Sequence, residues 1–325
     1  MNHEPDSVSP ADIHASSDVV IIDADHYSGW FDLRELWRYR ELVWIFAERD
    51  IKVRYRQTVV GIAWTVLQPL AQMIAFNGLF QMLNSKPIEG KVPYQVTSFC
   101  GLILYQLFSG ILATATACLV DNRQMVTKVY FPRVVLPLSA CLRPLLDFGI
   151  GLVVLVLLML WFQVPPTAAV LLSPVFLILT VLSGLAFGLW LSALNAHYRD
   201  FGYVVPFLLQ LGMVVCPVLY ESSKVPAPWN WLYHVNPMAA VLDGFRWTML
   251  GAGAPDWHGV VISLVSLIFL LVSGGWYFRR VERFLADNIR TDTRKERKTA
   301  DDSGRATGSS NRLGGRRLGG IRNLR

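Results

Sequence analysis

Six blocks of apolar residues follow one another along the chain, separated by short polar stretches. They cover residues 59–83, 97–120, 138–162, 168–194, 203–220 and 260–278. Each has about the 17–25 residues that a helix needs to cross the hydrocarbon core of a bilayer, the fourth a little more and the fifth a marginal number. The pattern predicts an all-α membrane protein with six transmembrane helices.

Composition agrees with this class. Of the 325 residues, 53% are hydrophobic and 17% are charged, whereas soluble globular chains carry about 25% charged residues. The four cysteines, Cys100, Cys118, Cys141 and Cys216, all lie inside apolar blocks without metal-ligand spacing. We expect them to be buried free thiols.

The basic residues fix an expected orientation. If both termini are cytoplasmic, 25 of the 30 Lys and Arg residues lie in inner segments and four in outer ones. Cytoplasmic loops carry such an excess of Lys and Arg. We therefore predict that both termini are cytoplasmic. Residues 1–32 are expected to form a soluble tail, and 289–325 a basic disordered tail too poor in apolar residues to fold.

Residues 33–56 read as an amphipathic helix ahead of the membrane domain, which we assign to 57–288. Arginines and lysine gather roughly opposite one apolar side of this helix, as in helices that lie in the membrane plane. Leu42, Ile45 and Phe46 fall off the apolar face, which favours an additional protein contact; the alternative is a plain membrane anchor. The expected apolar side comprises Leu33, Leu36, Trp37, Val43, Trp44, Ala47, Ile51 and Tyr55.

Three further segments carry candidate interactions. Residues 121–133 predict a short cytoplasmic helix ending near Phe131-Pro132, whose apolar side would suit a groove on a partner or rest as an ordinary loop helix. Arg143 and Asp147 lie four residues apart inside the third block, where an ion pair is slightly favoured over a transport role. Outer residues 221–257 are rich in aromatic side chains and indicate either a re-entrant segment or an interfacial aromatic belt.

Catalytic and nucleotide motifs are missing from the sequence. It contains no G-x-x-x-x-G-K-[ST], H-E-x-x-H or G-x-S-x-G, so the chain is not expected to cradle ATP phosphates itself. Asp23-Ala-Asp25 matches the D-x-D of many glycosyltransferases, which keeps a membrane-embedded glycosyl- or acyltransferase as an alternative. The basic tail lacks interleaved aromatic residues, so nucleic acid is not an expected partner.

Five motifs in order resemble one family. They are LRELWRYRELVWIFAERDIKVRYRQTVVGIAWTVLQPL, the segment from Asn122 to Pro137, LNAHYRDFGYVVPFLLQLGMVVCPVLY, VNPMAAVLDGFRWTML and VERFLADNI. Together they are similar to the membrane-spanning permease of type-2 ABC exporters, in the branch that exports polysaccharide and polyol phosphate (O-antigen, capsule and teichoic acid). The resemblance covers about residues 19–288.

The resemblance implies an assembly of two permease copies with two copies of a separate ATPase subunit in a bacterial inner membrane. The cargo would be a polysaccharide on undecaprenyl diphosphate, with ATP and Mg²⁺ bound by the partner and no cofactor on this chain. A drug or small-lipid permease of the same broad class is the alternative cargo reading. Membrane lipids are further expected partners.

Site residues follow from these motifs in three groups. The substrate path would include Arg54, Arg56, Gly61, Trp64, Pro69, Phe76, Phe80, Tyr105, Phe108 and Tyr220. Coupling to the ATPase would involve Asn122, Lys128, Tyr130, Phe131 and Pro132. Structural or gating roles are expected for Arg143, Asp147, Arg199, Asp200, Asn236, Pro237 and Arg246.

Overall fold

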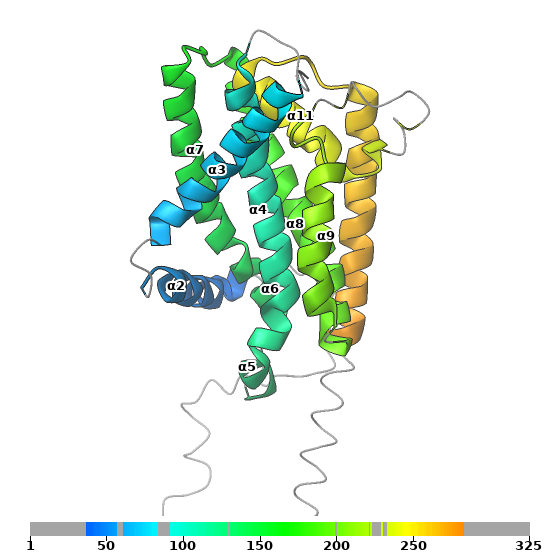
Figure 1. Ribbon diagram of the computed structural model, residues 1–325. Helices are drawn as coiled ribbons and strands as arrows, with labels where there is room; N and C mark the ends of the chain where they lie inside the picture. Colours follow the sequence, from blue (N-terminus) through cyan, green and yellow to red (C-terminus); the bar gives the residue numbers. More distant parts are fainter. Residues whose placement is uncertain are drawn as a thin grey trace, which may run out of the picture.

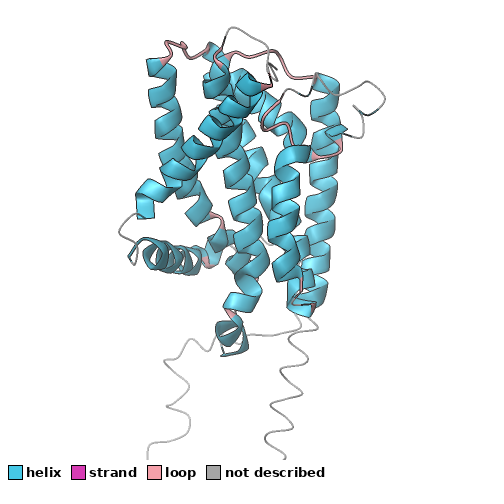
Figure 2. Cartoon of the chain, viewed as in Figure 1, coloured by secondary structure: helices cyan, strands magenta, loops and turns pink. Residues whose placement is uncertain are grey.

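The computed structural model describes residues 37–56, 61–83, 92–128, 131–198, 200–220, 222, 229 and 233–282, and within them the regular structure is helical, with no strand (Figures 1 and 2). The predicted tails, 1–32 and 289–325, lie outside these residues. The helices are α2 (Arg40–Arg56), α3 (Gly61–Met82), α4 (Tyr94–Asp121), α5 (Arg123–Lys128), α6 (Val135–Ala140), α7 (Leu142–Trp161), η2 (Ala168–Leu172), α8 (Ser173–His197), α9 (Phe201–Val215), α11 (Pro237–Leu250) and a last helix, Trp257–Glu282.

Helix α4 is the centre of the fold. It carries no charged residue before its final Asp121, and a helix that is apolar on all sides is buried. It packs most extensively on α8 and also contacts α3, α6, α7, α9 and α11. On α8, Gly184 and Gly188 allow the close approach: a Cβ on Gly188 would lie 2.6 Å from Ala115 Cβ on α4. Small residues spaced by four bring membrane helices together in this way.

Four helical stretches are long and apolar enough to span a membrane. They are Tyr94–Asp121, Val135–Trp161, Ala168–His197 and Trp257–Glu282, which match the second, third, fourth and sixth apolar blocks. The other two blocks differ. Helix α3 has 22 residues but carries several amides, and α9 has only 15, about 22 Å at 1.5 Å per residue. The described helices thus establish a multi-pass membrane protein without by themselves establishing six spans.

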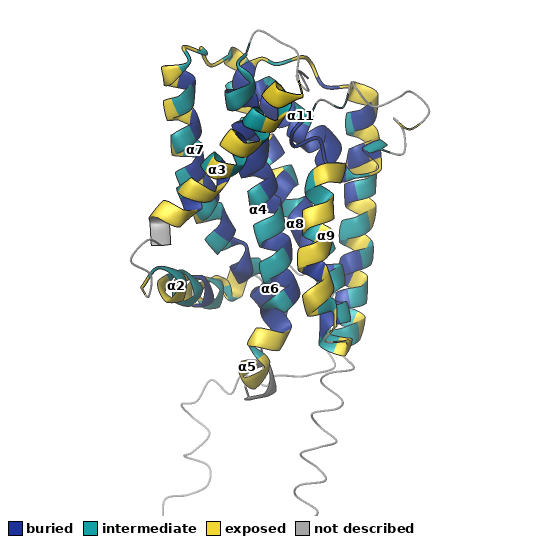
Figure 3. Ribbon diagram, viewed as in Figure 1, coloured by how far each residue is buried: buried dark blue, intermediate teal, exposed yellow. Residues whose placement is uncertain are grey.

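Large apolar side chains on the outside of the bundle support the same class. On α7, Val153, Leu157 and Leu160 are at least 60% exposed, and Phe207 on α9 and Phe269 on the last helix are equally open (Figure 3). Soluble monomers seldom expose apolar surface on this scale. The four cysteines are buried and unbridged, as the sequence predicted.

Helix α2 lies across one end of the bundle, beside α6 and the start of α7 (Figure 1). The bundle covers a different face of α2 from the apolar face that the sequence predicted. Phe46, which was placed off that face, is 4% exposed, whereas Trp37 and Trp44 are 70% and 61% exposed. Phe46 is buried because its ring meets that of Phe131, with centroids 5.8 Å apart. Packing on the bundle, not the charge pattern alone, selects which side of α2 is covered.

Candidate functional site

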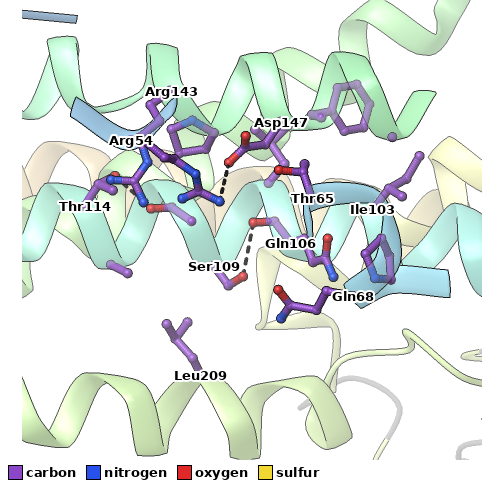
Figure 4. A pocket seen from close by; sticks show the side chains of 17 residues that line it. Arg54, Thr65, Gln68, Ile103, Gln106, Ser109, Thr114, Arg143, Asp147 and Leu209 are labelled. Carbon is purple, nitrogen blue, oxygen red and sulfur yellow. Dashed lines mark hydrogen bonds and ion pairs between the residues drawn. The ribbon is translucent and has the colours of Figure 1, made fainter. Parts of the chain in front are cut away.

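A cavity of about 270 Å³ opens between α2, α3, α4, α7 and α9 (Figure 4). It is far larger than the ~10–15 Å³ that one buried water molecule requires. Its lining combines charged, polar and apolar groups: Arg54, Thr65, Gln68, Pro69, Ile103, Gln106, Leu107, Ser109, Gly110, Ala113, Thr114, Arg143, Pro144, Asp147, Phe148, Gly151 and Leu209. Mixed lining of this kind, with a few convergent polar groups, is typical of a binding site.

Asp147 on α7 is the centre of the polar end of the cavity. Arg54 Nη2 of α2 lies 3.2 Å from Asp147 Oδ2, and the Tyr55 hydroxyl donates a hydrogen bond to Asp147 Oδ1. Partial burial, and then the hydrogen bond to Asp147, raise the pKa of Tyr55 above its ordinary value, so this phenol stays a donor at neutral pH. Two consecutive residues near the end of α2 therefore bind one carboxylate on α7, Arg54 by an ion pair and Tyr55 by a hydrogen bond.

Arg143 does not form the ion pair expected with Asp147. The carboxylate of Asp147 instead pairs with Arg54, and the Nε atom of Arg143 is buried without a hydrogen-bond partner among the described residues. In Figure 4 the Arg143 side chain lies beside that of Arg54 at the same end of the cavity. The spacing of four residues made a helix-internal pair possible, but α2, distant in sequence, supplies a better-placed cation.

Amide and hydroxyl side chains line the rest of the cavity, and the sequence analysis did not single them out. Gln106 on α4 donates to Gln72 on α3 across 3.2 Å, and Thr114 on α4 donates to the Ala140 carbonyl of α6 at 3.1 Å. Gln68 and Thr65 add further polar groups from α3. Amides inside apolar blocks are costly without partners, and that cost was the available sequence signal.

The same α2 helix is joined to the turn between α4 and α5. Arg49 Nη2 donates to Asn122 Oδ1 at 2.8 Å, and Asn122 Nδ2 donates to the Cys118 carbonyl of α4 at 2.9 Å. The following segment is fastened as well, since Arg133 Nη1 donates to the Glu282 carbonyl at 3.0 Å. α2 is thus hydrogen-bonded through Arg49 to Asn122, directly before α5.

Phe131 is not available as an exposed coupling contact. Its side chain is 7% exposed and packs on Phe46, so the expectation that it enters a partner's groove is wrong for this conformation. On α5, Met125 is 42% exposed and offers an apolar surface instead. Pro132 is half-buried, Lys128 ends α5 with a side chain outside the description, and Tyr130 lies outside the described residues.

At the opposite end of the bundle, Arg246 fastens α11. It is 3% exposed, donates from Nη1 to the Tyr220 carbonyl at 3.0 Å and from Nη2 to the Val218 carbonyl, and has Asp243 Oδ1 at 3.8 Å. α11 begins at the N-cap Asn236, whose side chain accepts from the Met238 amide at 3.0 Å, followed by Pro237 at N1. These contacts give the predicted outer residues a structural role.

The expected substrate-path residues scatter. Arg54 and Pro69 line the cavity, Trp64 is 58% exposed on α3, and Phe76, Phe80 and Tyr220 are half-buried. Tyr105 and Phe108 were expected to face a channel, but they are 5% and 7% exposed inside the core, where their rings meet 5.9 Å apart. In this chain they are packing residues.

The remaining expected residues are terminal or undescribed. Arg56 ends α2 and is exposed, Gly61 begins α3, and Asp200 is the N-cap of α9 without a side-chain cap bond. Arg199 lies outside the described residues. In the part of the chain that the structure describes, no group of three or more His, Cys, Asp or Glu residues is arranged to hold a metal ion.

Comparison with known proteins identifies the family. The model of the ABC-2 type transporter family matches residues 41–250, well over half of the chain. The chain is 29% identical over 255 residues to the O-antigen export system permease protein RfbA of Myxococcus xanthus, covering 78% of this chain and 97% of that protein. It is 25% identical to the protein of the same name from Klebsiella pneumoniae (76% and 94% covered) and 24% identical to the polysialic acid transport protein KpsM of Escherichia coli (61% and 80% covered). The resemblance that the sequence motifs indicated is confirmed: this chain is a multi-pass membrane protein that belongs to the ABC-2 type transporter family.

Proposed function

We propose that this chain is the membrane-spanning permease subunit of an ABC exporter that moves a lipid-linked polysaccharide, of O-antigen or capsular type, across the bacterial inner membrane. The observation that carries the proposal is its similarity to named O-antigen export permeases over 97% and 94% of their lengths. Membership in a transporter family makes the chain a transport subunit and not an enzyme.

In this proposal the membrane architecture has six spans, with both termini cytoplasmic. Helix α3 and α9 complete the four longer spans, because both pack on α4 within the bundle. α2 lies in the membrane plane at the cytoplasmic end, where its exposed Trp37 and Trp44 would sit at head-group depth. α11 is a re-entrant helix at the outer end, supported by its nearly complete burial within the protein.

Two copies of the chain pair with two copies of an ATPase that binds ATP and Mg²⁺. α5, at the cytoplasmic end of α4, is the proposed contact with the ATPase, and Met125 is its described exposed apolar side chain. Met125→Asp is therefore expected to lower ATP-driven export at least about tenfold, since it places a charge in an apolar contact. Leu171→Asp, at an exposed position of η2 near the other end of the bundle, is the matched control. Equal export by both variants would contradict the contact between α5 and the ATPase.

The proposed cargo is carried on undecaprenyl diphosphate. The cavity supports this cargo, because Arg54 and Arg143 lie together at its polar end and arginine binds phosphate groups well. The aromatic residues Trp64, Phe76, Phe80 and Tyr220 stay predicted contacts for the sugar chain.

Deletion of the gene tests the proposal. The expected phenotype is loss of surface glycan together with accumulation of lipid-linked glycan on the cytoplasmic side, and restoration of both by the wild-type chain. Unchanged surface glycan with altered drug or small-lipid export would replace the polysaccharide cargo with the alternative one. Restoration must also be obtained by a variant with Asp23 and Asp25 changed to alanine; failure of that variant would favour the transferase alternative.

A further inference from the structure

The polar end of the cavity holds more positive than negative charge. Arg54 and Arg143 face it from α2 and α7, and among the described lining residues Asp147 is the single carboxylate. Asp50 lies at longer range and pairs with Arg49, 2.8 Å away, so it does not neutralise the excess. Tyr55 is a neutral donor. An excess cation at the border of a membrane domain attracts an anion.

Donor capacity is left over as well as charge. A guanidinium carries five N–H donors in a planar fork, and Arg143 Nε is buried without a partner among the described residues. An unsatisfied buried donor is costly, so a ligand that accepts from it gains correspondingly. The space for such a ligand is present, since both arginines line the cavity of about 270 Å³.

Asp147 holds the position that an anionic ligand would take. Its Oδ2 receives Arg54 at 3.2 Å and its Oδ1 receives the Tyr55 hydroxyl. A phosphate group presents more acceptor oxygens and more charge than a carboxylate, and guanidinium forks bind it in two-point fashion. A phosphate entering the cavity therefore competes with Asp147 for Arg54 while also satisfying Arg143.

We propose that the cavity binds a phosphate head group between Arg54 and Arg143, and that this phosphate displaces Asp147 from Arg54 and so releases the end of α2 from α7. The inference rests on the proposed function in taking the lipid carrier as the physiological source of the phosphate. Because α2 is joined to the base of α5 through Arg49 and Asn122, 2.8 Å apart, the release reaches the proposed ATPase contact. Asp147 acts as a positioning residue, because it holds Arg54 as long as the cavity contains no phosphate.

Binding of undecaprenyl diphosphate to the full chain in phosphatidylcholine nanodiscs tests the site. Asp147→Asn is expected to bind about tenfold more tightly, because the internal competitor is removed, and Arg143→Gln about tenfold more weakly. Arg143→Lys should recover part of the loss, since it keeps the charge but not the fork. Each variant is first checked for monodispersity and melting temperature; if Asp147→Asn does not fold, the Arg143 pair still decides the question.

Matched controls come from the exposed Glu48–Lys52 pair on another side of α2, whose side chains are 47% and 68% exposed. Glu48→Gln and Lys52→Gln change the net charge by the same amounts, and both are expected to bind within about twofold of wild type. The proposed site would be overturned if Glu48→Gln raised the affinity for undecaprenyl diphosphate as much as Asp147→Asn does. Wild-type affinity in Arg143→Gln would overturn it as well.

Release of α2 has its own measurement. Spin labels at Val53→Cys on α2 and Leu146→Cys on α7, both exposed positions, are expected to show a longer or broader distance distribution when undecaprenyl diphosphate is added. The four native cysteines are buried and should not compete for label. An unchanged distribution despite saturation would overturn the displacement of Asp147.

A parallel arm with phosphatidylglycerol separates the two sources of phosphate. If undecaprenyl diphosphate occupies the site and phosphatidylglycerol does not, the carrier is supported as the ligand. If both lipids occupy it equally well, the site is assigned to ordinary anionic lipid and the link to cargo is overturned. Failure of the inference is distinguishable from failure of the proposed function. If Asp147→Asn binds the lipid as wild type does, the inference fails but the deletion phenotype still supports the function. If surface glycan is unchanged after deletion, the proposed function itself fails.

Discussion

Two clusters of arginine and aspartate lie at opposite ends of the molecule, and the same residue types play different roles in them. In α11, Arg246 is 3% exposed, has Asp243 three residues earlier at 3.8 Å and donates to two backbone carbonyls. In α7, Arg143 has Asp147 four residues later, but Asp147 pairs with Arg54 of another helix. Each arginine has a buried Nε without a partner among the described residues.

The two arginines differ in what surrounds the guanidinium: backbone carbonyls in one cluster and an open cavity in the other. Around Arg246 the carbonyls of residues 218 and 220 accept hydrogen bonds from both Nη atoms, whereas Arg143 faces a cavity of about 270 Å³. A guanidinium whose donors end on carbonyls contributes to stability, because removing it strands buried acceptors. One that borders an open cavity contributes little to stability and keeps its donors for a ligand.

The largest expected effect follows from this contrast. Arg246→Met should lower the free energy of unfolding by about 3–5 kcal/mol, because it breaks a buried charged network and takes the guanidinium donors away from the carbonyls of Val218 and Tyr220. Arg143→Met should cost less than about 1 kcal/mol, since it removes no hydrogen bond made by Nε and relieves repulsion from Arg54. Both can be measured by SDS-induced unfolding in mixed micelles.

Arg246→Lys refines this test. Lysine keeps the charge near Asp243 but lacks the planar fork, so it should recover only part of the loss. Equal costs for Arg246→Met and Arg143→Met would show that the two clusters do not differ in the way proposed.

A second prediction concerns the surroundings of Arg246. A Cβ on Gly101 of α4 would lie 2.4 Å from Arg246 Nη2 and 2.7 Å from the Val218 carbonyl oxygen. Since Arg246 is held by its carbonyl acceptors and cannot move aside, Gly101→Ala is expected to cost about 1–3 kcal/mol. Gly149→Ala on α7, where nothing lies within 4 Å of the new Cβ, is the control and should be neutral or stabilise by up to about 1 kcal/mol. A harmless Gly101→Ala would mean that this end of the bundle tolerates more movement than its contacts indicate.

Much of the helical layout was predictable from the sequence, because long apolar blocks have few alternatives to membrane helices. The blocks at 97–120 and 168–194 became α4 and the η2–α8 stretch with ends shifted by a few residues. The family was predictable too, because five motifs in order are specific. The block at 59–83 likewise became α3 with ends shifted by one or two residues. The short α9 was less predictable, because the apolar block at 203–220 runs on past its last residue, Val215.

The site was predictable only in part, because it is assembled from helices far apart in the chain. Arg54 and Asp147 were both candidates, but local spacing suggested Arg143 as the partner of Asp147, and only the crossing of α2 over α7 brings Arg54 to 3.2 Å. Tyr105 and Phe108 illustrate the converse error. Aromatic residues in a span suggested a sugar path, yet both are buried beside α8 and α9, and exposure is a property of packing that sequence alone does not give.

The smallest expected effect belongs to Tyr55, which ties α2 to the open cluster. Tyr55→Phe removes one hydrogen bond to Asp147 from a half-buried side chain and should cost about 0.5–1 kcal/mol. Burial, and then Asp147, raise the pKa of Tyr55 above its ordinary value of 10.0, so the bond is fully present below the unfolded pKa and is lost as pH rises through the folded one. The difference in unfolding free energy between wild type and Tyr55→Phe should thus stay constant from about pH 7 to 9 and shrink at higher pH. A difference that instead grows with alkalinity would mean that Tyr55 does not act as a donor to Asp147, and the link between α2 and the cavity would rest on Arg54 alone.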